Sequence, residues 1–284
     1  MRVAVTGAGG MLGHDVLEAA RAGGHEVAAL SRAELDLRDE GATKDAIATL
    51  RPEVIVNCAA FTDVDGAEAN EAEALAINGA GAGNLARSAT EAGAHLVHVS
   101  TDYVFDGKAS RPYVESDPTA PRSAYGRTKL AGEFEVLAAD PRHAVVRSSW
   151  LFGVAGHSFP RTMLELASGG REEVSVVTDQ VGCPTYTAHL AAALVTVAER
   201  RSRGIHHIAA AGHCSWHELA VVLFERAGVN CRVLEATSKE MARPAPRPAW
   251  SVLASERPDA VQLPSWQEGI GAYLEAQSRA AVAS

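Results

Sequence analysis

The chain has 284 residues, is 47% apolar and carries a formal net charge of −9. A chain of this size buries about 75% of its surface on folding, which is enough for one large α/β domain without disulfides. The acidic balance argues against nucleic-acid binding, which depends on Lys and Arg. No apolar run approaches the roughly 20 residues of a membrane helix, and no signal-type segment opens the sequence. We therefore expect a cytoplasmic protein that acts on a small molecule.

The first half of the sequence alternates short apolar runs with segments of helical period. The runs are apolar on both faces, as strands of a covered parallel sheet are: Arg2–Thr6, Glu26–Leu30, Glu53–Asn57, His95–Ser100 and Ala144–Ser148. The segments between them predict helices over Leu12–Ala22, Ala42–Leu50, Glu68–Ala92 and Tyr125–Leu137. This alternation predicts an α/β fold with a doubly wound parallel sheet and right-handed crossovers.

The pattern becomes less regular after Phe152. The later segments predict strands at Glu173–Val177 and Ile205–Ala209 and helices at His189–Arg200, Trp216–Ala227 and Ser265–Gln277. We expect residues 1–153 to form a dinucleotide-binding domain that carries the catalytic residues. Residues 154–284 are expected to form mainly a smaller C-terminal substrate lobe, with some strands and helices returning to the main sheet. The four cysteines are scattered without a CxxC pair, which favours packed, reduced thiols.

The strongest early signal is a glycine repeat where the first strand gives way to the first helix. Gly7, Gly10 and Gly13 recur at every third position and enclose Met11 and Leu12. Such glycines allow a tight turn, a close approach of backbone to a pyrophosphate, and close helix–strand packing. The first N–H groups of the helix would then face the phosphates. This spacing predicts a Rossmann-like cofactor site and is similar to that of the extended short-chain dehydrogenases.

The segment after the second strand bears on the choice of cofactor. NAD-selective sites place an acid at the tip of that strand, but here Ser31 and Arg32 follow Leu30. A hydroxyl beside a guanidinium suits a 2′-phosphate, which favours NADPH, although Asp36 leaves NADH open. Asp36 and Leu37 are also placed to meet the adenine.

Small residues follow the third predicted strand. Ala59, Ala60 and Thr62 are expected to lie beside the second half of the cofactor, although they are equally compatible with simple packing.

The candidate catalytic pair is Tyr125 and Lys129, which lie on one face of a predicted helix. A phenol has a reference pKa near 10, and a neighbouring cation lowers it by roughly 1–3 units. Ser100 and Thr101 end the fourth strand, at the edge where open α/β sheets bind ligands. Alternation along the strand lets only one of these two hydroxyls enter the site.

Taken together, these motifs resemble the dTDP-4-dehydrorhamnose reductases. The matching stretches lie at 7–13, 100–107, 113–118, 125–133, 147–153, 179–185, 247–253 and 266–269. The resemblance implies that NADPH, or NADH, reduces the C4 ketone of a dTDP-linked 4-keto-6-deoxyhexose, dTDP-4-dehydro-L-rhamnose, to dTDP-L-rhamnose. It implies that Thr101 supplies the active hydroxyl and that Tyr125 donates the proton. Lys129 would contact the nicotinamide ribose and lower the pKa of Tyr125. It also places Asp102 and Trp150 against the sugar nucleotide.

Metal binding receives little support from the sequence. Relatives in this family can carry Mg²⁺ at a subunit contact, where Asp15 is a candidate ligand, but residues 184–189 offer no acidic partner. His206 and His207 are adjacent in a strand and so point to opposite faces. We predict no metal ligands. A homodimer is expected as the commonest symmetric assembly.

Two other functions remain open at this point. The first is another nucleotide-sugar reductase or an epimerase, because substrate choice depends on the less regular C-terminal lobe. The second is a non-catalytic regulatory subunit, since the beta subunit of methionine adenosyltransferase resembles this family. The intact Thr101, Tyr125 and Lys129 favour an enzyme.

Overall fold

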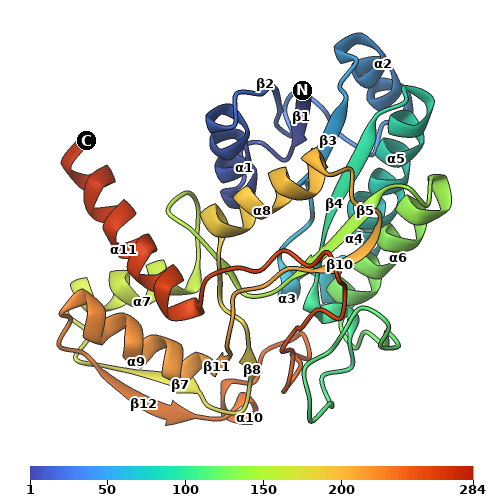
Figure 1. The fold of residues 1–284 in the computed structure, drawn as a ribbon. Helices are drawn as coiled ribbons and strands as arrows, with labels where there is room; N and C mark the ends of the chain where they lie inside the picture. Colours follow the sequence, from blue (N-terminus) through green and yellow to red (C-terminus); the bar gives the residue numbers. More distant parts are fainter. Residues whose placement is uncertain (284) are drawn as a thin grey trace.

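The fold is built on one parallel sheet. It is described by a computed structural model that covers residues 1–283, so Ser284 of the predicted C-terminal lobe lies outside the described residues. Six strands pair in the order β10-β5-β4-β3-β1-β2 (Figure 1). They are β1 (Arg2–Thr6), β2 (Glu26–Leu30), β3 (Val54–Asn57), β4 (His95–Thr101), β5 (Ala144–Ser148) and β10 (Gly204–His207). The strand order reverses between β1 and β3, which makes the carboxyl edge there the ligand-binding edge. The predicted doubly wound α/β fold is confirmed.

Helices cover both faces of this sheet (Figure 1). One face carries α1 (Met11–Ala22) and α8 (Thr187–Glu199), which pack against each other. The other face carries α2 (Glu40–Leu50), α5 (Ala82–Glu91) and α6 (Ala124–Ala139). Alternate residues of β1 serve the two cores: Val3 and Val5 pack under α1 and α8, and Ala4 packs on the opposite side. This arrangement explains why the strands carry apolar residues on both faces.

The predicted helix over Glu68–Ala92 is wrong in its bounds. The chain forms α3 (Val64–Ala69) and α4 (Glu71–Leu75), then a π-helical turn at Ala76–Gly81 that leads into α5. The wide turn contains the buried Asn78, whose Oδ1 accepts the Phe61 N–H at 2.8 Å and whose Nδ2 donates to Thr128 Oγ1 at 3.1 Å. The hydrogen bonds of Asn78 to two neighbouring segments therefore stabilise the wide turn, although the sequence has regular helical spacing through it.

The second part of the chain forms a lobe with its own core. It contains α7 (Phe159–Ser168), α9 (Trp216–Ala227), α11 (Trp266–Ala283) and a parallel pair of strands, β7 (Glu173–Val177) and β12 (Arg232–Ala236). Leu223, Phe224 and Tyr273 lie at the centre of this core. The short elements are β6 (Leu151–Phe152), β8 (Val181–Gly182), β9 (Thr185–Tyr186), β11 (Cys214–Ser215), α10 (Ser238–Met241) and a 3₁₀ turn (Asp102–Val104). The sequence did not predict α7 or β12.

Two elements of the second half return to the main sheet. α8 packs on α1, and β10 adds the edge strand next to β5. β10 ends at His207, two residues earlier than predicted, and both His206 and His207 are buried. The His207 ring contacts the carbonyl oxygens of Tyr113 and Ala254, so this histidine has an ordinary structural role.

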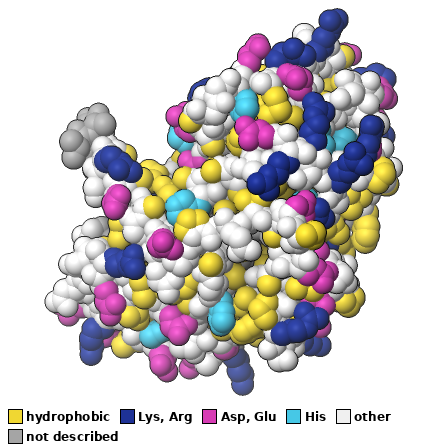
Figure 2. Space-filling view, viewed as in Figure 1, with side chains coloured by type: hydrophobic (Ala, Val, Ile, Leu, Met, Phe, Trp, Pro, Cys, Tyr) yellow, Lys and Arg dark blue, Asp and Glu magenta, His cyan; other side chains and the backbone are white. Residues whose placement is uncertain are grey.

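Several surface and binding features follow from the described residues. None of the helices in residues 1–283 has the length and apolarity needed to cross a membrane. All four cysteines are free thiols. Within the same residues no group of three or more His, Cys, Asp or Glu side chains is arranged to hold a metal ion. Acidic and basic side chains are intermingled on the face shown in Figure 2.

Candidate active site

The turn between β1 and α1 is a cradle that only glycine fits. Gly7 has a φ of +67°, and a Cβ there would lie 2.6 Å from the backbone nitrogen of Ala59. A Cβ at Gly13 would clash with the carbonyl oxygen of Gly7. The β1–α1 turn and the chain after β3 thus touch at the switch point of the sheet, as a dinucleotide site requires.

The N-terminus of α1 offers a site for an anion. Gly10 precedes the helix and no side chain caps it. The first turn, which includes Met11 and Leu12, carries no acidic residue. The first N–H groups of a helix lack partners within the helix, and the helix dipole favours negative charge there. The residues present therefore fit the pyrophosphate of a dinucleotide.

The segment after β2 contains two arginines, Arg32 and Arg38, together with acidic side chains. The Arg32 side chain is 72% exposed, and its nearest acid is Glu73 at 3.9 Å. Arg38 Nε donates to both carboxylate oxygens of Asp36 at 3.0 Å, and this partner lowers the pKa of Asp36 to about 2. Asp36 and Arg38 therefore engage each other, and Arg32 remains as the exposed cation at this edge. Arg38 was not among the predicted site residues.

The other residues predicted around the adenosine occupy varied positions. The Ser31 N–H donates to Glu34 at 2.7 Å, which closes the turn after β2. Leu37 is buried in the core beside α5, so its side chain supports the site from below. Ala59 and Ala60 are partly buried next to the glycine turn, and Thr62 is exposed.

Local packing fixes the start of α6, which carries the candidate catalytic pair. Ser123 caps the helix by accepting the Gly126 N–H at 3.1 Å. A Cβ at Gly126 would clash with the carbonyl oxygen of Tyr103, so glycine lets the helix approach the loop after β4. The ring of Tyr125 packs edge-on against Tyr103 with centroids 5.5 Å apart. Tyr125 is thereby held at the carboxyl edge of the sheet.

The two hydroxyls at the end of β4 point in opposite directions. Ser100 Oγ donates to Glu133 at 2.5 Å, away from the candidate site. Thr101 Oγ1 donates to Asp102 at 3.0 Å, and its side chain lies close enough to Tyr125 to shift the pKa of that phenol. The structure thus brings together Thr101, Asp102 and Tyr125.

Burial dominates the electrostatics of this cluster. It raises the pKa of Tyr125 to about 12, whereas Thr101 lowers that pKa and Asp102 raises it further. The net shift is opposite to the expected lowering by Lys129, because the loss of water around the phenol is the largest influence and Lys129 is not among the groups that act on it. Burial also raises the pKa of Asp102 to about 6. At neutral pH the phenol is therefore protonated and can act as a proton donor.

Lys129 lies one helical turn after Tyr125, and only 2% of its surface is exposed. Its Nζ donates to the Val99 carbonyl oxygen at 2.7 Å. Burial lowers the pKa of Lys129 to about 8, against the opposing influence of Glu133 and Cys58. The ammonium is thus positioned beneath the carboxyl edge and loses its proton more readily than an exposed lysine does.

Trp150 adopts a backbone conformation that large residues rarely take. Its φ is +50°, in the left-handed region, which costs of order 1–3 kcal/mol for such a residue. Its indole stacks on Trp216 with centroids 3.6 Å apart, and a Cβ at Gly182 would clash with the ring. The surrounding structure therefore holds Trp150 in one orientation between the sheet and the C-terminal lobe.

A charged contact joins the lobe to α3. Asp65 accepts hydrogen bonds from Arg247 Nη1 at 2.9 Å and Nη2 at 3.0 Å, and Arg243 approaches to 3.2 Å. These arginines hold the pKa of Asp65 well below its usual range. The Arg247 charge also acts on the Tyr103 phenol, so this contact closes one side of the candidate site.

Two polar residues of the site were missed as functional candidates. Asn57 ends β3 and His98 lies in β4, both fully buried in otherwise apolar strands. The available signal was a polar residue within each of two mostly apolar strands, and these two residues face each other only when the strands pair.

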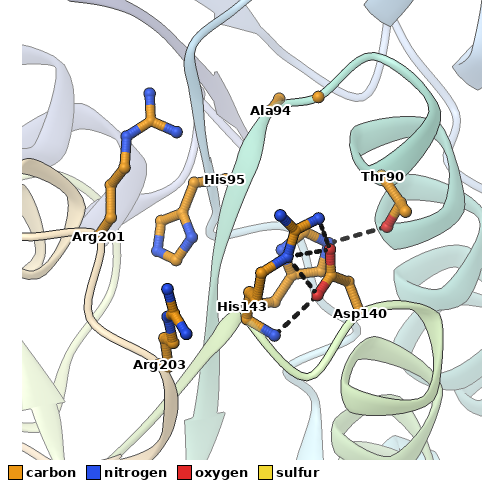
Figure 3. A pocket seen from close by; sticks show the side chains of 9 residues that line it. Thr90, Ala94, His95, Asp140, His143, Arg201 and Arg203 are labelled. Atoms are coloured by element: carbon orange, nitrogen blue, oxygen red, sulfur yellow. Dashed lines mark hydrogen bonds and ion pairs between the residues drawn. The ribbon is translucent and has the colours of Figure 1, made fainter.

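A separate cleft of about 170 Å³ lies at the opposite edge of the sheet. His95 at the start of β4 lines it together with Asp140, Arg201 and Arg203 (Figure 3). Thr101, at the other end of the same strand, is not part of this cleft. The cleft in Figure 3 is therefore distinct from the candidate active site.

Comparisons with known proteins agree with this geometry. A dTDP-4-dehydrorhamnose reductase of Mycobacterium tuberculosis is 46% identical over 264 residues, covering 90% of this chain and 86% of the relative. A probable dTDP-4,6-dihydroxy-2-methyloxan-3-one 4-ketoreductase of Streptomyces antibioticus is 45% identical over 90% of this chain and 88% of the relative.

The solved structures include a close match in fold. The dTDP-4-dehydrorhamnose reductase of Bacillus anthracis, solved in complex with NADP, superposes with a TM-score of 0.94 at 36% identity. The match covers 97% of this chain and 99% of that structure. The RmlD substrate binding domain family matches residues 1–279, and the chain therefore belongs to that family.

Proposed function

We propose that this protein is an NADPH-dependent reductase that converts dTDP-4-dehydro-L-rhamnose to dTDP-L-rhamnose. One observation carries the proposal: Thr101 and Tyr125 lie together at the carboxyl edge of the sheet, and the buried Lys129 follows Tyr125 by one turn of α6. The reductases of Mycobacterium tuberculosis and Bacillus anthracis support the choice of substrate.

In the proposed reaction the chain supplies the proton and holds the carbonyl oxygen. When bound, NADPH supplies the hydride that C4 of the sugar receives. Tyr125 donates its proton to the O4 oxygen, and its raised pKa keeps it protonated at neutral pH. Thr101 steadies the charge that develops on O4. Lys129 lies one turn after Tyr125 on α6, and its ammonium provides positive charge as the phenolate forms.

Substrate recognition is assigned to the surface between the two parts of the chain. We propose that residues 1–153 bind the cofactor and that residues 154–284 form mainly the substrate lobe. Asp102, buried beside Thr101, and Trp150, stacked on Trp216, are the proposed contacts to the sugar nucleotide.

NADPH is the preferred cofactor in this proposal. The support is the exposed Arg32 and the pairing of Asp36 with Arg38, which engages the carboxylate that a ribose 2′-hydroxyl would need. The proposed cofactor contacts are those predicted from the sequence: Gly7, Gly10, Met11, Leu12, Gly13, Ser31, Arg32, Asp36, Leu37, Ala59, Ala60, Thr62, Tyr125 and Lys129.

A second candidate is a 4-ketoreductase for a different dTDP-linked sugar, which the Streptomyces antibioticus relative at nearly equal identity favours. The test is a comparison of NADPH oxidation rates with dTDP-4-dehydro-L-rhamnose, other dTDP-linked 4-keto sugars, and UDP- and GDP-linked 4-keto sugars. The proposal predicts the highest kcat/KM for dTDP-4-dehydro-L-rhamnose. Oxidation with none of them would favour a regulatory subunit instead.

The assembly and location are proposals of the same kind. We infer a cytoplasmic homodimer, since a twofold dimer is the commonest symmetric assembly. Sedimentation of the purified protein at micromolar concentration tests this, and a monomer throughout the concentration range would refute it.

A further inference from the structure

Four buried polar side chains form a continuous line beneath the proposed active site. They are Thr6 on β1, Asn57 on β3, His98 on β4 and Lys129 on α6, each at most 2% exposed. Thr6 Oγ1 lies 2.7 Å from Asn57 Oδ1, Asn57 Nδ2 lies 2.9 Å from His98 Nδ1, and His98 Nε2 lies 3.5 Å from Lys129 Nζ. In such a line, the protonation of each group depends on its neighbours.

The backbone fixes the direction of the hydrogen bonds in this line. The Ala59 N–H donates to Asn57 Oδ1 at 3.0 Å, so that atom is the amide oxygen and Nδ2 faces His98. An amide nitrogen only donates, which makes His98 Nδ1 the acceptor. Burial lowers the pKa of His98 well below its usual range, so the ring is neutral. A neutral imidazole carries one proton, which must then sit on Nε2.

The Nε2–H of His98 therefore faces the amino group of Lys129. An ammonium cannot accept this hydrogen, whereas a neutral amine can, so the contact disfavours the charged form. The ammonium retains one firm acceptor, the Val99 carbonyl oxygen at 2.7 Å. The other groups acting on Lys129 are Glu133 on α6 and Cys58 after β3, which both favour its charge. Glu133 is itself paired with Arg147 on β5, and Tyr125 precedes Lys129 by one turn.

We propose that His98 is a positioning residue for the reaction: Asn57 fixes its tautomer, and its Nε2–H faces Lys129 Nζ and favours the neutral amine over the ammonium that donates to Val99. The inference rests on the proposed reductase function, in which the Lys129 ammonium acts on the cofactor and Tyr125. His98 thereby sets the pH above which that ammonium is lost. Nothing in this role requires His98 to touch the substrate.

The tautomer is tested by ¹⁵N NMR of protein labelled at histidine, without cofactor or turnover. The His98→Gln spectrum identifies the His98 signals by their loss. We expect wild-type His98 to show an unprotonated Nδ1 and a protonated Nε2, unchanged from about pH 5.5 to 8. In Asn57→Asp, a carboxylate faces Nδ1 and accepts a hydrogen bond, so the proton should move to Nδ1. A wild-type Nδ1–H tautomer, or titration near pH 6.5, would overturn the proposal.

The effect on Lys129 is tested by the pH dependence of NADPH affinity and of kcat. In wild type both should decline as the pH rises through about 8, where Lys129 loses its proton. In His98→Gln the side-chain oxygen can accept from the ammonium, so the decline should move up by about one pH unit. This variant adds no charge, so a shift cannot come from an added carboxylate. An unchanged decline in folded His98→Gln would refute the role.

A matched control is available at the other end of the sheet. His143 is 1% exposed, and its Nδ1 accepts the Leu96 N–H at 3.2 Å. His143→Gln should destabilise the fold without moving the pH at which NADPH affinity declines. If the pH of the decline shifted equally in both variants, the cause would be a general destabilisation of the fold, and the proposal would be overturned. If wild type oxidised no NADPH with any keto sugar, the proposed function would fail, while the NMR and affinity measurements would still decide on His98.

Discussion

The buried ion pair between Glu133 and Arg147 yields a prediction with a large expected magnitude. The two side chains are 2% and 3% exposed. Arg147 donates from Nε at 2.9 Å and from Nη2 at 2.6 Å, and Ser100 donates to the same carboxylate. Glu133→Gln keeps the volume but leaves the guanidinium buried without a counter-charge. Removing one partner of a buried pair costs about 3–5 kcal/mol.

Urea unfolding measures this loss as a lower free energy of unfolding. A thermal melt is a second measurement: at roughly 2 °C per kcal/mol for a chain of this size, the melting temperature should fall by at least about 6 °C. Glu173→Gln is a matched control, because Glu173 pairs with Arg232 at the surface, where the side chains are 50% and 76% exposed. Exposed pairs contribute about 0.2–1 kcal/mol. Equal losses in the two variants, or a loss below about 1 kcal/mol for Glu133→Gln, would refute the argument from burial.

Four further predictions concern the site. Tyr125→Phe should keep NADPH affinity but lose at least about 100-fold in kcat, and near-wild-type turnover would remove Tyr125 as the proton donor. Gly13→Ala should weaken NADPH binding, measured by fluorescence titration, because its Cβ would clash with a backbone oxygen of the cradle. Arg32→Ala should raise the Kd for NADPH more than that for NADH, and equal changes would remove the reason for preferring NADPH. The lowered pKa of Asp65 means that its pairing with Arg247 stabilises the fold fully above about pH 4, the usual pKa of a carboxyl, and loses this effect gradually as the pH falls. The stability deficit of Asp65→Asn should therefore be large at pH 7 and shrink steadily below about pH 4.

The main sheet and the cofactor cradle could be predicted because their signals are local. Apolar runs such as Arg2–Thr6 match their strand from end to end, and the glycine repeat marks the β1–α1 turn by its spacing alone, although Gly7 also faces Ala59 after β3. The helix over Glu68–Ala92 was predicted too regularly, because the ties from Asn78 to Phe61 and Thr128 join segments up to 50 residues apart. No local pattern contains that information.

The candidate site was predictable in its residue types but not in its electrostatics. The spacing of Tyr125 and Lys129 indicates a shared helix face, whereas the direction of the Tyr125 pKa shift depends on burial by the loop after β4. His98 lies three residues before Thr101, yet its role depends on Asn57, which is 41 positions away in the sequence. Such contacts become visible only when the strands are placed side by side.

The central claim is that this chain delivers a hydride to C4 and a proton to O4 of a dTDP-linked 4-keto sugar. The most direct measurement uses NADPH deuterated on the transferring position together with dTDP-4-dehydro-L-rhamnose, with the product analysed by proton NMR. We predict that the wild-type protein forms dTDP-L-rhamnose with one deuterium at C4. The Tyr125→Phe variant should form almost no product in the same time. A product without deuterium, or with deuterium at a carbon other than C4, would contradict the account.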